Sequence, residues 1–171
     1  MGYTSTPFSV DFGVGDVIVP SSEKRVIPVQ LDEFDNPQIN TYSLESTIAE
    51  KLDAILSRLE MTSRMKDFYD IYYLSNMFDF DGRKLQEAIF ETLQNRGTSY
   101  EKDSLTVIEN FTNDSGMVTK WNRWLKEIGN PQLDYKTVIE SIVSFLFPVW
   151  QAIINEDECF MMWNANNTEW K

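Results

Sequence analysis

The stretch from Tyr42 to Leu74 alternates charged side chains with apolar ones at helical spacing. At about 100° per residue, Lys51 and Arg58 lie on one edge of the apolar stripe of the first helix expected here. Arg64 and Asp67 share a flank of the next expected helix with apolar residues. A charge at the boundary of a core needs a partner, because an unpaired buried charge is costly. The pattern therefore predicts a Lys51–Asp67 ion pair between two antiparallel helices.

Two interpretations of this pair are open. The first is a structural salt bridge accompanied by an exposed Lys66–Asp70 pair at i,i+4, and composition alone favours it. The second is a site for polar chemistry. The sequence has no histidine and a single cysteine, Cys159, which excludes Ser-His-Asp and Cys-His catalysis, His-ligated metals and thiolate cages. Carboxylates, Lys, Arg and hydroxyls remain, and magnesium-dependent phosphoryl or nucleotidyl transfer uses that set.

Asp11 is a further candidate, because it stands between Val10 and Phe12 on an expected strand. A carboxylate on a strand between apolar neighbours is a common way to hold Mg²⁺ at the edge of a sheet. The more frequent explanation is an exposed residue on a strand whose other face is buried. Asp11 is therefore a candidate metal ligand.

Composition limits the classes of partner and compartment. The 171 residues suit one globular domain, with 42% hydrophobic and 25% charged residues. The net charge of −12 opposes broad binding to nucleic acid or to an anionic membrane, although a local basic site is compatible with it. The single cysteine and the lack of a secretory signal favour the cytoplasm. The uncharged run 141–155 is too short to span a bilayer and contains Pro148, so we expect a buried helix and no membrane partner.

The chain divides into a small β region, residues 1–41, and a helical region, residues 42–171, giving an α+β fold that is mostly α. Two short strands are expected within Phe8–Val19 and a further one at Val26–Leu31, followed by a polar connector over Asp32–Thr41. So few short strands make a poor independent sheet. They either pack on the helices or are the last part of a larger sheet.

Five helices are expected in the second region, most of them marked by caps. The first is expected from the N-cap Ser43 to about Leu59, and the second begins after Ser63. The third runs from the cap Asp81 to Gly97, and the fourth covers 118–128. The fifth begins at Asp134 and continues along 138–153, with a kink at Pro148. The tail after Asn155 holds Phe160, Trp163 and Trp170, so we expect it to pack back on the body.

Several blocks, in order, resemble the abortive-infection nucleotidyltransferase toxins of the AbiEii/AbiGii type. The ordered A-E-K and R-x-K-D-x-x-D blocks make the resemblance more specific than a lone short motif, and it covers nearly the whole chain. The blocks that carry it are Val10–Asp16, Tyr42–Glu45, Ile48–Leu52, Ser63–Asp70, 78–89, 121–125 and 145–149.

The resemblance implies a DNA-polymerase-β-like nucleotidyltransferase fold followed by a helical bundle. It also implies a nucleoside triphosphate and Mg²⁺ as cofactors, and transfer of a nucleotide, in related toxins to tRNA acceptor ends. Such toxins act in phage defence and type IV toxin–antitoxin systems, beside a co-encoded antitoxin. By motif match Lys51, Asp67 and Asp70 would be catalytic, with Lys51 near the triphosphate. Arg64 and Lys66 beside them would help to bind the nucleotide.

Asp11 would be a third, metal-holding carboxylate of the catalytic sheet. The family's opening motif, a Gly-Ser or Gly-Gly turn followed by a D-x-D strand, should lie upstream of it, yet this sequence contains neither dipeptide. We therefore expect the chain to correspond to the C-terminal part of a family member and to be inactive alone. The alternative is a non-catalytic binding or regulatory protein that contacts an antitoxin or RNA. A sheet edge left open by missing strands also predicts self-association.

Overall fold

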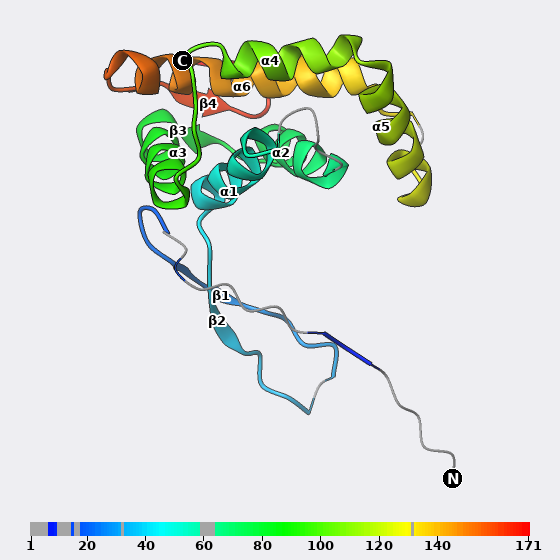
Figure 1. Cartoon of the computed structure of the whole chain (residues 1–171). Helices are drawn as coiled ribbons and strands as arrows, with labels where there is room; N and C mark the ends of the chain where they lie inside the picture. Colours follow the sequence, from blue (N-terminus) through cyan, green and yellow to red (C-terminus); the bar gives the residue numbers. More distant parts are fainter. Residues whose placement is uncertain (1–6, 10–14, 16–17, 32, 59–63, 131) are drawn as a thin grey trace.

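The computed structural model of the chain describes residues 7–9, 15, 18–31, 33–58, 64–130 and 132–171. Within these residues the fold is α+β and mostly α, which confirms the predicted class (Figure 1). The helices are α1 (Leu44–Leu56), α2 (Met65–Met77), α3 (Gly82–Arg96), α4 (Ser104–Asn110), the 3-10 turn η2 (Phe111–Asn113), α5 (Ser115–Glu127) and α6 (Tyr135–Asn155). The strands are β1 (Glu23–Val26), β2 (Gln38–Thr41), β3 (Phe80–Asp81), β4 (Met162–Asn164) and β5 (Glu169–Trp170).

The predicted caps set the helix ends. The hydroxyl of Ser43 accepts from the amide of Ser46 at 3.0 Å, and the carboxylates of Asp81 and Asp134 accept from amides two or three residues further on, in the first turns of α3 and α6. Gly97 ends α3 with a φ of 64°, a left-handed conformation that glycine adopts without strain. These helix ends confirm the prediction from sequence, although α1 ends at Leu56, before the expected end.

The core lies where α6 crosses the other helices. α6 packs against α2, α3 and α4, and α1 packs against α2 and α3. α6 is long and apolar enough to cross a membrane. Ten of its residues are buried among the other elements, so it is the central helix of the core, as expected for the uncharged run.

The expected N-terminal strands are partly wrong. β1 ends at Val26, where a strand over Val26–Leu31 was expected, because Pro28 interrupts the ladder. The expected polar connector contains β2, which pairs antiparallel with β1. The expected strands within Phe8–Val19 fall largely outside the described residues, and the described ones there, 8, 9, 15, 18 and 19, form none.

The β1–β2 hairpin stands away from the helices (Figure 1), and all of its strand residues except Thr41 are exposed. It is tied to the helical body through Val19. The amide of Val19 donates to the hydroxyl of Ser46 at 2.8 Å, and the hydroxyls of Ser43 and Ser46 donate to the Val19 carbonyl at 2.6 and 3.0 Å. Both serines are buried at the start of α1. The hairpin is therefore anchored at its base and uncovered along its length.

The tail adds β4 and β5 to β3 in a second sheet, of order β3–β4–β5, which was not expected. Its two tryptophans pack on α6 as predicted. The rings of Trp163 and Trp170 lie 5.0 and 5.9 Å from that of Phe145, and the indole N–H of Trp170 donates to the Phe145 carbonyl. Phe160 does not take part in this packing and is 71% exposed.

Candidate functional site

Helices α1 and α2 bring Lys51, Asp67 and Asp70 together. The Lys51 ammonium lies 3.0 Å from Asp67 Oδ1 and 2.9 Å from Asp70 Oδ2. The Asp67 carboxylate is almost fully buried, with 3% of its side chain exposed. The predicted Lys51–Asp67 pair is therefore present, and Asp70 gives Lys51 a second carboxylate.

Two further cations surround this cluster. Arg64 Nε lies 2.7 Å from Asp67 Oδ2, and Lys66 Nζ lies 3.3 Å from Asp70 Oδ2 in the predicted i,i+4 pair. Both oxygens of the buried Asp67 thus have a cationic partner. The arrangement satisfies the charge at the core boundary, as the sequence pattern required.

The two carboxylates keep Lys51 charged. Burial alone lowers the pKa of a lysine, but hydrogen bonds from Lys51 to Asp70 and Asp67 and the attraction of both charges outweigh burial. The pKa of Lys51 is therefore raised above its ordinary value of 10.5. Two of the three ammonium N–H bonds are used by these carboxylates, which leaves one for another acceptor.

A cavity of about 370 Å³ opens beside the cluster. It contains Arg96, which the sequence did not single out, at the end of α3 and 2.8 Å from Glu50. The sequence around Arg96 gives little indication of this role, because its approach to Glu50 depends on the packing of α1 on α3. The lining residues are Glu50, Lys51, Asp53, Ala54, Ser57, Arg58, Arg64, Asp67 and Arg96.

The metal expectation finds no support among the described residues. They contain no group of three or more His, Cys, Asp or Glu side chains that fits a metal ion. Asp67 and Asp70 instead direct their oxygens to cations. Asp11 lies outside the described residues. The described residues therefore do not form a Mg²⁺ site.

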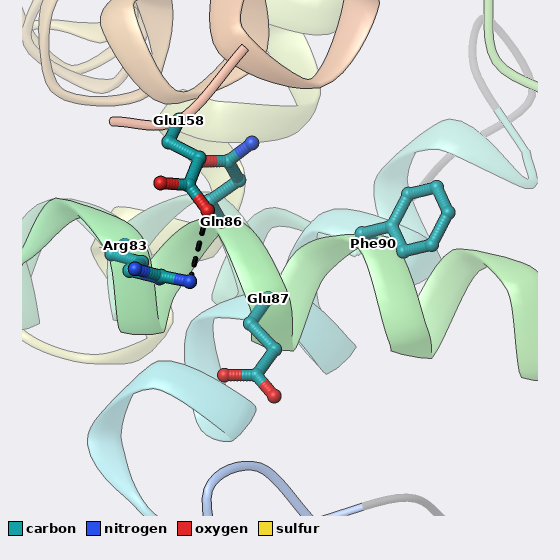
Figure 2. Close-up of a pocket in the computed structure, with 5 residues that line it drawn as sticks. All are labelled: Arg83, Gln86, Glu87, Phe90 and Glu158. Carbon is teal, nitrogen blue, oxygen red and sulfur yellow. Dashed lines mark ion pairs between the residues drawn. The ribbon is translucent and has the colours of Figure 1, made fainter. Parts of the chain in front are cut away.

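A second cavity, of about 250 Å³, lies between α3 and the tail (Figure 2). Its arginine, Arg83, pairs with Glu158 at 2.9 Å, as the dashed line in Figure 2 marks. The Gln86 amide donates to the carbonyl of residue 157 and accepts from the amide of Cys159. These contacts join the tail to α3, so we assign the residues around this cavity a structural role.

One comparison with known proteins finds a match. The family model for the nucleotidyl transferase AbiEii toxin of type IV toxin–antitoxin systems covers residues 1–155 of the 171. No curated protein and no solved structure matches the chain. The match includes both helices that carry the Lys51 cluster, and membership in such a system implies a co-encoded antitoxin. The chain belongs to the AbiEii nucleotidyltransferase toxin family.

Proposed function

We propose that this chain is the helical, nucleotide-contacting part of a nucleotidyltransferase toxin that acts in the cytoplasm in phage defence. The observation that supports the proposal is the cavity beside Lys51, Asp67 and Asp70, all within the family match. In this proposal the free N–H of Lys51 contacts a triphosphate, while Asp67 and Asp70 hold the ammonium in place. Arg64 and Lys66 fix the two carboxylates from the outside and add positive charge near the nucleotide.

The proposal includes a limit on activity. The sequence contains no Gly-Ser or Gly-Gly dipeptide, with which the opening motif of the family begins. Two-metal nucleotidyl transfer needs the carboxylates that follow this turn. We therefore expect this chain to bind a nucleoside triphosphate but to transfer no nucleotide to tRNA by itself.

Calorimetric titration with ATP, GTP, CTP and UTP in the presence of magnesium tests the proposal. Wild-type binding that Lys51→Ala abolishes supports it. The matched control is Lys136→Ala, which removes an exposed lysine of an i,i+4 pair on α6. An assay with labelled nucleotide and tRNA should show no incorporation, and incorporation would contradict the expected inactivity.

One observation favours a second candidate, a non-catalytic binding or regulatory protein that contacts an antitoxin or RNA. Lys51 already has two carboxylate partners, which is also the arrangement of a purely structural salt bridge. If no nucleotide binds and Lys51→Ala changes only the stability, this candidate replaces the first.

We also propose self-association through the β1–β2 hairpin. Val26, Ile27 and Ile39 are 58%, 45% and 41% exposed, and β1 and β2 each leave one backbone edge unpaired within the described residues. Lys24 lies at one end of the hairpin and the acidic Glu33 and Asp35 near the other. Two copies in antiparallel orientation would place opposite charges together.

Light scattering over a range of protein concentrations tests this arrangement. We expect a dimer that dissociates in Ile39→Lys and persists in Phe160→Lys, a control that places the same charge on an exposed aromatic of the tail. A monomeric wild type at every concentration would contradict the proposal.

A further inference from the structure

The cavity beside Lys51 carries a positive excess on an acidic protein. Its lining cations outnumber its lining carboxylates by one, whereas the whole chain has a net charge of −12. The cations are Lys51, Arg58, Arg64 and Arg96, and the carboxylates are Glu50, Asp53 and Asp67. Even with Asp70, which pairs with Lys51 from outside the lining, the cavity repels anions less than the acidic remainder of the molecule does.

Three of the four cations already have acidic partners. Lys51 and Arg64 pair with Asp67, and Arg96 pairs with Glu50. The remaining cation, Arg58, directly follows the C-cap of α1 and is exposed at the cavity. Its guanidinium has no carboxylate partner among the described residues. Arg58 is therefore the lining cation whose guanidinium is not engaged by a carboxylate of the described residues.

We propose that Arg58 is the principal anion-binding residue of this cavity and that its ligand is a polyphosphate, such as the triphosphate of a nucleotide. A guanidinium binds two phosphate oxygens at once through its fork of N–H donors. The third N–H of Lys51, on the same cavity wall, supplies a further donor, although the charge of Lys51 is offset by two carboxylates. Arg58 supplies the attraction and Lys51 a directional contact. The identification of the ligand as a nucleotide rests on the proposed function, whereas the binding of a polyphosphate by Arg58 does not.

A structural role for Arg58 makes a different prediction. A cation near the C-terminus of α1 would stabilise the helix through its dipole, so its removal would lower the melting temperature and leave ligand binding unchanged. A ligand-binding role predicts that removal of Arg58 weakens ligand binding and leaves the melting temperature unchanged. The two readouts, binding and melting temperature, therefore separate the roles.

Calorimetry with sodium tripolyphosphate, without magnesium, at 50 and 300 mM NaCl tests the inference. We expect Arg58→Gln to weaken binding about tenfold or more at low salt, and Arg58→Lys to restore part of it. Wild-type binding should also weaken at high salt, more than that of the variant. The control is Arg123→Gln, which removes an exposed arginine on α5. It should bind as the wild type does, and all variants should melt at the wild-type temperature.

Two results would overturn the inference: a wild type that does not bind tripolyphosphate, and an Arg58→Gln variant that binds it as tightly as the wild type. The nucleotide titrations distinguish this failure from that of the proposed function. If tripolyphosphate binding needs Arg58 but no nucleotide binds, the anion site stands and the nucleotide assignment fails. If nucleotides bind through Lys51 and Arg58→Gln has no effect, the proposed function stands and the assignment of Arg58 fails.

Discussion

Replacing Lys51 by methionine isolates the contribution of the buried ion pairs to stability. The methionine side chain keeps most of the volume of lysine but removes the charge. Asp67 and Asp70 then lose a cation at 3.0 and 2.9 Å. The variant is expected to be less stable at pH 7, because Asp67 is buried and a buried carboxylate depends on its partners.

The magnitude follows from the partners that remain. Removing one member of a buried pair costs about 3–5 kcal/mol when the other charge is left uncompensated. Here Asp67 keeps Arg64 at 2.7 Å and Asp70 keeps Lys66 at 3.3 Å. We therefore expect a smaller loss, about 2 kcal/mol of unfolding free energy, which lowers the melting temperature by about 4–8 °C for a chain of this size. Urea denaturation and thermal melting both measure it.

The control is Lys66→Met. The Lys66 side chain is 70% exposed, so its pair with Asp70 is screened by water and its loss should cost under about 0.5 kcal/mol. Equal losses for Lys51→Met and Lys66→Met would refute the reasoning, because burial of Asp67 is what should separate them.

The pH dependence supplies a second check. The pKa of Lys51 in the folded protein is raised above 10.5, so folding favours its charged form. The stabilisation is complete below pH 10.5 and is lost as the pH rises through the raised pKa of the folded state. The unfolding free energy of the wild type should exceed that of Lys51→Met by the same amount at pH 7 and pH 9, and this difference should shrink above pH 10.5.

Three other substitutions test the packing. Gly82→Ala should lower the unfolding free energy by about 1–3 kcal/mol, measured by urea denaturation. A Cβ at this position would lie 2.7 Å from Cys159 Sγ and 2.7 Å from a tail carbonyl oxygen. A variant as stable as the wild type would show that the tail can shift. Ser46→Ala leaves the buried amide of Val19 without its acceptor, so trypsin should cleave the hairpin faster while the helices stay folded; an unchanged cleavage rate would contradict this anchor. Trp163→Phe removes an indole N–H that donates to a buried carbonyl at 2.6 Å, and should lower the unfolding free energy by about 1–3 kcal/mol; a loss near zero would argue against this bond.

The parts of the fold that depend on local chemistry were predictable from the sequence. The caps at Ser43, Asp81 and Asp134 act within three residues of themselves, so a short window of sequence contains the whole interaction. The same holds for the Lys66–Asp70 pair within one helix. Lys51–Asp67 joins two helices, but the requirement that boundary charges be paired made it predictable.

The parts that depend on tertiary packing were not. α4 has seven residues, too few for a clear helical period, and its N-cap residue Asp103 makes no side-chain capping bond. The strands β3, β4 and β5 have two or three residues each, and β3 pairs with β4 across about eighty positions of sequence. For the same reason Arg96 entered the candidate site only when the packing of α1 on α3 was known.

The tail has a practical consequence for anyone who trims the protein. The family pattern ends at residue 155, yet Trp163 lies beyond it with 1% of its surface exposed. Cutting at the end of the pattern would remove that indole ring from the interior and open a void against α6. Such a shortened protein would have a weakened scaffold, and a lost activity in it would say nothing about the chemistry of the site.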